Sequence, residues 1–325
     1  MPEISVVIPV YGCDSCLGEL HRRLTHALRG IPGGYELIFI DDRSPDGSWQ
    51  LLRELAAGDP ALRAHRLSRN FGEEAAITAG LTLSRGRWTV VMDCDLQDAP
   101  EDIPRLHAKA SEGYEIVFTR RNRTGHSAIR ILGSRLYFRL LKKFLQGDID
   151  AAFGNFSIVS RKALEHSLSL RDKDRHYRAI LVWLGFNHTA IDVNHAPRHA
   201  GSSSYTFGRL VRHAVDGVFF QTAVLLRWIV LGGFAMAISG LVLAAWFAID
   251  RFATGADIPG WSSLAVIVLL VGASINISLG VTSLYVGKIF SHVKDRPVFV
   301  IDESVVEGSP EHPPLPASTT GVSAD

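Results

Sequence analysis

Two long runs of the sequence carry no charged side chain, and they constrain the fold more than any other feature. The runs extend from Ile229 to Ile249 and from Ile258 to Gly287. Each exceeds the roughly 20 residues that a helix needs to cross the core of a bilayer. A buried hairpin in a soluble core is the alternative, but core helices rarely stay uncharged on every side for so long. We therefore predict two transmembrane helices, joined by a short connector.

Basic residues flank these runs on one side of the predicted membrane. The connector holds only Arg251, whereas the outer flanks hold Arg209, Arg212, Arg227, Lys288, Lys294 and Arg296. Because basic residues mark the cytoplasmic side, we expect an integral inner-membrane protein with the amino-terminal part and both termini in the cytoplasm. Met1 to Glu3 lead directly into an apolar run, which leaves no room for a signal peptide. A formal net charge of +1 gives no reason to expect nucleic acid as a partner.

The amino-terminal part alternates short apolar runs with segments of helical spacing. The apolar runs cover residues 4–10, 35–40 and 88–92, and the helical segments cover residues 16–29, 48–57 and 73–84. This alternation predicts an α/β fold with a mainly parallel sheet flanked by helices. Ligands bind beyond the carboxyl ends of such strands. The residues at those ends are Tyr11, Asp41, Asp42, Asp93 and Asp95.

Residues 93–98 read Asp-Cys-Asp-Leu-Gln-Asp and supply oxygen ligands for a hard divalent cation. Carboxylate and amide oxygens suit Mg²⁺ or Mn²⁺, which can neutralise a nucleotide diphosphate during bond cleavage. The dinucleotide motif G-x-G-x-x-G and the P-loop motif are both absent, which disfavours a dehydrogenase or a P-loop ATPase. Cys13 and Cys16 form a C-x-x-C, but Cys94 is the one further cysteine, so we interpret the pair as coincidental rather than as a zinc or redox site.

Two further segments combine basic and apolar residues. Residues 128–145 have helical apolar spacing with Arg130 among several basic side chains, which suits either a membrane-surface helix or a helix docked on the soluble core. Residues 205–220 predict a second juxtamembrane helix. We expect an amino-terminal domain at 1–200, a juxtamembrane helix at 201–226, a membrane hairpin at 227–290 and a tail at 291–325. The tail is expected to be disordered after residue 302.

Four motifs occur in one order along the chain: Val7 to Tyr11, Asp41 to Gly47, Arg69 to Gly72 and Asp93 to Asp98. Their sequence resembles that of family 2 glycosyltransferases, which have the Rossmann-like GT-A fold. With Pro100 to Pro104 following, it is similar to the polyprenyl-phosphate branch that includes dolichyl-phosphate mannose synthases and GtrB-like glucosyltransferases. The match covers about residues 4–220.

The resemblance assigns roles to individual residues. It implies nucleoside contacts from Pro9, Tyr11, Ile40 and Asp42. It implies that Asp93, Asp95 and Gln97 hold the metal and the donor diphosphate, with Cys94 contributing mainly backbone. Arginines suit phosphate oxygens, and the implied acceptor-binding residues are Arg120, Arg123, Arg130, Arg198 and Ser203.

Two positions depart from the family pattern. Ser204 stands where a lysine is frequent, and Asn155 stands where GtrB-like members often carry aspartate. The second departure removes a candidate catalytic carboxylate. A phosphate acceptor is already largely anionic near neutral pH and needs no general base. Asp95 and Asn155 are therefore the expected catalytic residues, with Asn155 orienting the acceptor.

The resemblance implies an enzyme that transfers a sugar from a nucleotide-sugar to undecaprenyl phosphate with inversion at the anomeric carbon. UDP-glucose is the favoured donor, ahead of GDP-mannose and other UDP-sugars, and the product would serve the cell envelope. One alternative is a polysaccharide synthase, but Gln221 and Arg227-Trp228 lack that family's Gln-x-x-Arg-Trp spacing. Another is a non-catalytic membrane scaffold. Small residues such as Gly272 and Gly280 allow a homo-oligomer or serve the hairpin itself.

Overall fold

The computed structural model describes residues 1–121, 153–170, 172–173, 175–193, 224–254, 260–294, 296–306 and 309–311. The chain divides into two compact units. One contains residues 1–142, 146–202 and 297–325, and the other contains residues 143–145 and 203–296. The predicted helices at 128–145 and 205–220 lie outside the described residues.

Four parallel strands form the centre of the first unit. They are β1 (Ile4–Val10), β2 (Tyr35–Asp41), β3 (Leu62–Leu67) and β4 (Trp88–Val91), in the spatial order β4-β1-β2-β3. The connecting helices are α1 (Asp14–Leu28), α2 (Ser48–Gly58) and α3 (Glu73–Leu83). The strands and helices predicted from apolar patterning are confirmed, and β3 is an addition that the patterning did not reveal.

The outer strands make the sheet mixed rather than mainly parallel. The described strands follow the order β7-β5-β6-β4-β1-β2-β3-β8-β9. The added strands are β5 (Ile116–Arg121), β6 (Phe153–Ser160), β7 (His188–Val193), β8 (Ile301–Val306) and β9 (Ser309–Glu311). Strand β6 runs antiparallel to β4 and β5, β5 is parallel to β7, and β8 is antiparallel to β3 and β9.

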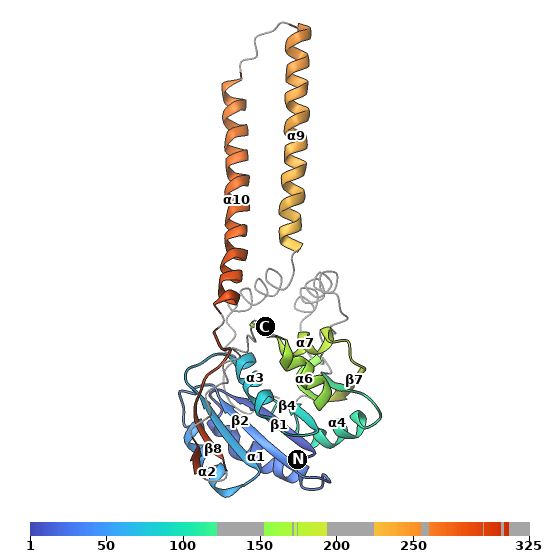
Figure 1. Cartoon of the computed structure of the whole chain (residues 1–325), viewed down its shortest axis with the longest axis vertical. Helices are drawn as coiled ribbons and strands as arrows, with labels where there is room; N and C mark the ends of the chain where they lie inside the picture. Colours follow the sequence, from blue (N-terminus) through green and yellow to red (C-terminus); the bar gives the residue numbers. More distant parts are fainter. Residues whose placement is uncertain are drawn as a thin grey trace, which may run out of the picture. The chain divides into compact units, whose positions relative to one another are not determined.

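Helices cover both faces of this sheet (Figure 1). One core cluster joins α1, α2 and α4 (Ile103–Ala110), which follows the short 3-10 helix η1 (Pro100–Asp102), to side chains such as Val6 and Ile8. The other joins α3, α6 (Arg161–Ser169) and α7 (Tyr177–Trp183) to side chains such as Val7 and Ile40. Successive strand residues point to opposite faces, so uninterrupted apolar strands supply both cores.

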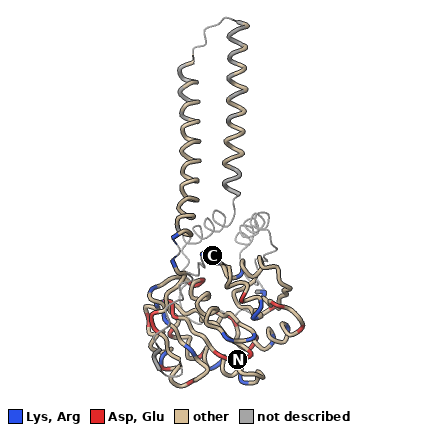
Figure 2. The backbone as a smooth tube through the Cα atoms, in the orientation of Figure 1, with Lys and Arg blue, Asp and Glu red and all other residues tan. Residues whose placement is uncertain are grey.

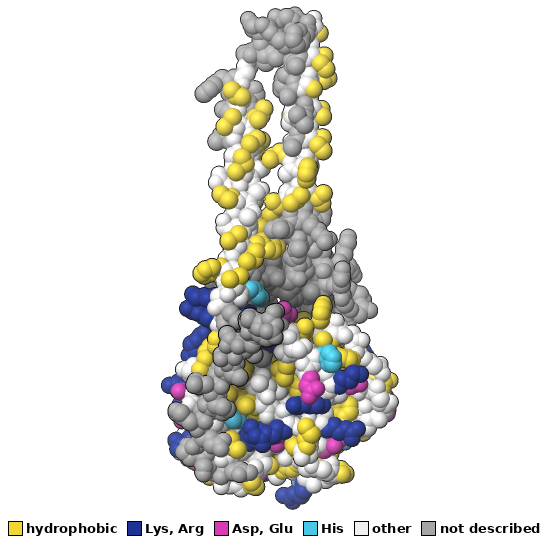
Figure 3. Space-filling view, in the orientation of Figure 1, with side chains coloured by type: hydrophobic (Ala, Val, Ile, Leu, Met, Phe, Trp, Pro, Cys, Tyr) yellow, Lys and Arg dark blue, Asp and Glu magenta, His cyan; other side chains and the backbone are white. Residues whose placement is uncertain are grey.

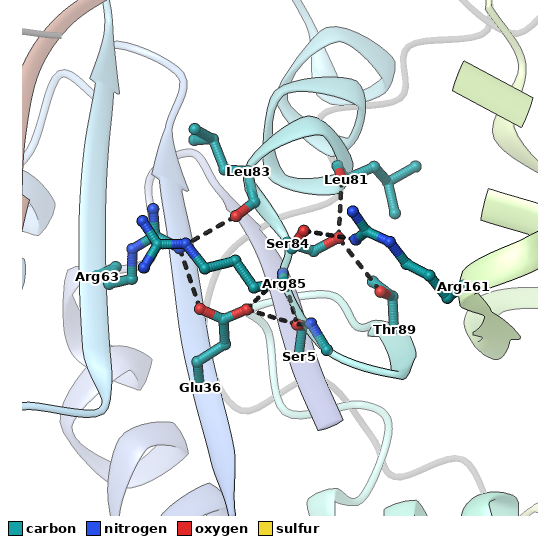
Figure 4. Close-up of polar contacts among 10 residues, drawn as sticks. Ser5, Glu36, Arg63, Leu81, Leu83, Ser84, Arg85, Thr89 and Arg161 are labelled. Atoms are coloured by element: carbon teal, nitrogen blue, oxygen red, sulfur yellow. Dashed lines mark hydrogen bonds and ion pairs between the residues drawn. The ribbon is translucent and has the colours of Figure 1, made fainter. Parts of the chain in front are cut away.

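A buried polar network ties the amino ends of the strands to the segment after α3 (Figure 4). The Glu36 carboxylate accepts hydrogen bonds from Ser5 Oγ at 2.6 Å and from the Arg85 amide at 2.7 Å, and it pairs with Arg63 Nη1 at 3.0 Å. Glu36 and Arg63 are 7% and 8% exposed. Gly86 is required here because an added Cβ would lie 2.6 Å from the Ser5 backbone nitrogen. This network supports the framework of the fold, meaning the sheet and its packed helices, rather than ligand binding. It lies at the amino ends of the strands, whereas ligands bind beyond their carboxyl ends.

The expected disorder after residue 302 is wrong for the described residues 303–306 and 309–311. Strand β8 adds to the edge of the sheet, with Ala64 opposite Val305 and His65 opposite Ser304. Val305 is buried in the first core cluster. The polar sequence of β8 concealed it, because its strand pairing comes from β3, far away in the sequence.

The second unit contains two long helices, α9 (Val224–Thr254) and α10 (Trp261–Val293). Between Trp261 and Gly287, α10 carries no charged residue (Figure 2). Exposed hydrophobic side chains line both helices, including Phe234 and Leu279 (Figure 3). Among the described residues, one helix is apolar and long enough to cross a membrane, over Leu270–Gly287, and none of that segment is buried. A membrane crossing by α9 stays a prediction.

Candidate active site

The candidate site lies at the carboxyl edge of the parallel strands. Val10 at the end of β1 is opposite Asp41 at the end of β2, and Val7 in β1 is opposite Val91 at the end of β4. Tyr11, Asp42 and Asp93 therefore leave three adjacent strands at the same edge, as the sequence predicts. Tyr11 is 54% exposed, whereas Asp42 is buried.

Asp42 anchors the loop that precedes α3. Its Oδ1 accepts the amide of Phe71 at 2.7 Å, and its Oδ2 accepts the amide of Gly72 at 2.8 Å. Burial raises the pKa of Asp42 above its ordinary value, and the two amide hydrogen bonds act in the opposite direction. Gly72 has a φ of 98°, which favours glycine at the start of this helix. Asp42 thus stabilises the loop before α3, and its contact with a nucleoside stays a prediction.

The side chains of Pro9 and Ile40 belong to the sheet. Both residues are buried, and Ile40 packs in the second core cluster. Any contact that they make with a nucleoside is therefore expected from the backbone or from the shape that they give to the edge. Their predicted role stays a prediction.

The segment after β4 alternates between accessible and buried residues. Asp93, Asp95 and Gln97 are partly exposed, whereas Cys94 and Leu96 are buried. The amide of Gln97 donates to Asp95 Oδ1 at 3.1 Å, and Leu96 has the left-handed φ of 59°. Three oxygen-bearing side chains within five residues are thus accessible to solvent.

The chemistry of this donor set would suit a divalent cation such as Mg²⁺ or Mn²⁺, which would neutralise charge on a bound diphosphate. Among the described residues, no group of three or more His, Cys, Asp or Glu side chains could hold a metal. Magnesium sites commonly use one or two carboxylates, with substrate phosphates and waters completing the shell. Asp93, Asp95 and the Gln97 amide meet that requirement in kind.

A disulfide crosses the site and was not predicted. Cys13, just after β1, is bonded to Cys94 between the two candidate metal-binding aspartates, with a Cα–Cα distance of 6.4 Å. Cys16 is buried and free. Cys13 and Cys16 do not pair with each other, in keeping with the interpretation of their spacing as coincidental. The expectation that Cys94 contributes mainly backbone omitted this covalent link, which no sequence spacing indicates.

Asn155 enters the site from β6. The antiparallel pairing of β6 with β4 places the start of β6 beside the carboxyl end of β4. Asn155 Nδ2 donates a hydrogen bond of 2.5 Å to Oε1 of Glu73, the first residue of α3. The sequence patterns do not identify Glu73 as a site residue. The one signal for it is its position at the start of α3, directly after the loop that follows β3.

Burial and neighbouring charge raise the proton affinity of the Glu73 carboxyl. Although Glu73 keeps contact with solvent, the surrounding protein raises the pKa of its carboxyl, and the nearby Glu74 and Asp95 carboxylates add to the increase. Arg178 opposes it. Such an acidic edge favours binding of a cation.

Of the predicted phosphate-binding residues, one is described. Arg120 lies in β5 opposite Phe153 and is exposed. The other residues lie outside the described part of the chain, and they are Arg123, Arg130, Arg198 and Ser203. Their roles stay predictions.

The chain is similar in sequence to known glycosyltransferases. The sequence profile described as glycosyl transferase family 2 matches residues 5–168. The uncharacterized glycosyltransferase YkcC of Bacillus subtilis is 33% identical over 93% of this chain and 94% of its own length. The undecaprenyl-phosphate 4-deoxy-4-formamido-L-arabinose transferase of Pseudomonas fluorescens is 34% identical over 99% and 97%. The prophage-derived bactoprenol glucosyl transferase of Shigella flexneri is 31% identical over 93% and 98%.

Proposed function

This chain belongs to glycosyl transferase family 2, and we propose that it transfers a sugar from a nucleotide-sugar to undecaprenyl phosphate. The observation that carries the proposal is the similarity to two transferases named for undecaprenyl or bactoprenol acceptors. The similarity spans at least 93% of this chain and therefore includes most of its apolar helices. A lipid acceptor and an apolar anchor suit one another physically.

The proposed reaction is one displacement. An oxygen of the lipid phosphate forms a bond to the anomeric carbon, and the bond from that carbon to the donor diphosphate breaks. Its electron pair leaves on the diphosphate oxygen, so the anomeric configuration inverts. The acceptor is already anionic, which explains why an amide such as Asn155 suffices where a hydroxyl acceptor would require a base.

The residues divide the work between donor and acceptor. Tyr11 and Asp42 would contact the nucleoside, and Asp93, Asp95 and Gln97 would hold a divalent cation beside the diphosphate. When bound, that cation would neutralise charge on the leaving group. Arg120 would attract the acceptor phosphate, and Asn155 would orient it. UDP-glucose is the proposed donor, and the cytoplasmic membrane face is the proposed location.

The test uses purified protein in detergent with undecaprenyl phosphate and a panel of radiolabelled UDP- and GDP-sugars. Labelled lipid from one donor, abolished by EDTA and restored by Mg²⁺ or Mn²⁺, is the expected result. Labelled polysaccharide in place of labelled lipid would favour the synthase alternative. If no donor binds in the presence of metal, the protein is a scaffold and the proposal is wrong.

A further inference from the structure

We infer that β8, the strand that follows α10, positions the nucleotide end of the site through Asp302 and Glu303; this inference rests on the proposed function. The strand begins eight residues after α10 ends at Val293. It pairs with β3 along the sheet edge, and the Ser68 amide donates to the Val300 carbonyl at 2.9 Å. The segment after the apolar helices is thus part of the unit that holds the site.

Glu303 stabilises an arginine that reaches the end of β2. Its carboxylate accepts from Trp49 Nε1 at 3.2 Å and lies 3.6 Å from Arg66 Nη1. On its other side, Arg66 Nε lies 3.1 Å from Oδ2 of Asp41, whose side chain is fully buried. The Arg66 guanidinium also lies over the Trp49 ring, 5.7 Å from its centroid. Glu303 therefore helps to hold Arg66, and Arg66 in turn balances the charge of the buried Asp41 carboxylate.

Asp302 holds the next part of the same loop. Its Oδ2 pairs with Arg43 Nη1 at 2.8 Å. Arg43 has a φ of 58°, a left-handed conformation that costs energy for a residue other than glycine. An exposed ion pair alone contributes about 1 kcal/mol or less. Here the Asp302–Arg43 pair restrains the residue directly after Asp42, so it should fix the conformation of the loop that follows β2.

Three consecutive residues are consequently held from three directions. Arg66 holds Asp41, the loop amides of Phe71 and Gly72 hold Asp42, and β8 holds Arg43. Two of these three restraints depend on β8, directly or through Arg66. Loss of the β8 carboxylates should loosen the Asp42 loop without touching the metal-binding turn, so donor binding should weaken while turnover is preserved.

The experiment uses the full-length chain and compares the unaltered protein with Asp302→Ala, Glu303→Ala and the double variant. Calorimetry gives the Kd of UDP with Mg²⁺, and initial rates give the donor KM and kcat. We expect the double variant to raise donor Kd and KM about five- to tenfold, a change of roughly 1 to 1.4 kcal/mol, with kcat within about twofold. Glu303→Gln keeps an acceptor for Trp49 and should recover part of the loss. Glu54→Ala, an exposed acid on α2 bonded to Gln50, is the matched control.

The outcomes separate two failures. If the unaltered protein binds UDP and the double variant binds it equally well, the inference is wrong and the proposed function stands. If kcat falls while KM is unchanged, β8 acts on the chemistry rather than on donor binding, and the inference is again wrong. If the unaltered protein binds no nucleotide, the proposed function fails and the inference fails with it. A lowered thermal midpoint with unchanged donor Kd would show a purely structural role and overturn the inference.

Discussion

The side-chain amide of Asn155 donates a 2.5 Å hydrogen bond to the carboxylate of Glu73, joining the start of β6 to the first turn of α3. Both residues lie beside the segment after β4 that carries Asp95. The amide is therefore bonded to a carboxylate, in a contact that solvent still reaches. A carboxylate at position 155 would instead place two negative charges in contact.

We predict that Asn155→Asp lowers stability and activity together. Like charges at hydrogen-bond distance are unfavourable, so the free energy of unfolding should fall by about 1 kcal/mol and kcat/KM by about tenfold or more. Denaturant unfolding and initial rates measure the two effects. The double variant Glu73→Gln with Asn155→Asp restores one donor and one acceptor and should recover most of both. If the double variant is no better than the single variant, this contact has no such role.

The cysteines give a second prediction. Peptide mapping without reduction should yield a cross-linked pair containing Cys13 and Cys94, with Cys16 as a free thiol. Because the bond closes a loop with a sequence separation of 81, reduction should lower the free energy of unfolding by about 2 to 4 kcal/mol. Cys13→Ser should reproduce the loss and make stability insensitive to reductant. A Cys13–Cys16 link, or three alkylatable thiols in the oxidised protein, would contradict the assignment.

The buried pair in the framework predicts a large stability effect away from the site. Glu36→Ala leaves Arg63 without its carboxylate partner, so the free energy of unfolding should fall by about 3 to 5 kcal/mol. The exposed Glu54→Ala should change it by no more than about 0.5 kcal/mol. Urea unfolding of the detergent-solubilised protein compares the two. Equal effects would mean that the Glu36 pair contributes no more than a surface residue.

His65 predicts how stability depends on pH. It is 3% exposed, its Nδ1 lies 2.8 Å from Ser304 Oγ, and burial lowers its pKa from 6.5 to about 4. The unfolded chain therefore binds a proton more readily than the folded chain between these values. The contribution of neutral His65 is fully present above about pH 6.5 and is lost as pH falls toward 4, by roughly 3 kcal/mol in total. Unfolding free energies at pH 7.5 and pH 4.5 measure it, and His65→Gln should flatten this part of the profile. An unchanged profile in His65→Gln would assign the dependence to other groups.

Apolar patterning was sufficient for the central strands because their residues are buried on both sides of the sheet. It missed β3, whose sequence Leu-Arg-Ala-His-Arg-Leu contains three basic or titratable side chains. Each of these finds a partner elsewhere: Arg63 pairs with Glu36, His65 with Ser304 and Arg66 with Asp41. A local window contains none of these partners, so the strand resembles a loop.

The candidate site was predictable to the extent that it follows strand ends. Tyr11, Asp42, Asp93 and Asp95 follow apolar runs, and parallel strands bring such residues to one edge. Glu73, the Cys13–Cys94 bond and the β8 carboxylates were missed because they reach this edge from a helix start, a loop and the far end of the chain. The positions of these residues depend on tertiary packing rather than on any local sequence pattern.

The most direct test of the account is the mass of the lipid made by purified protein from undecaprenyl phosphate, Mg²⁺ and a mixture of UDP- and GDP-sugars. We predict one new lipid, heavier than the acceptor by a single sugar residue. Asp95→Asn should reduce it by about 100-fold or more, while the exposed Glu101→Gln control leaves it unchanged. An acceptor lipid of unaltered mass with every donor, or equal product from Asp95→Asn, would contradict the assignment of this edge as a polyprenyl-phosphate sugar transfer site.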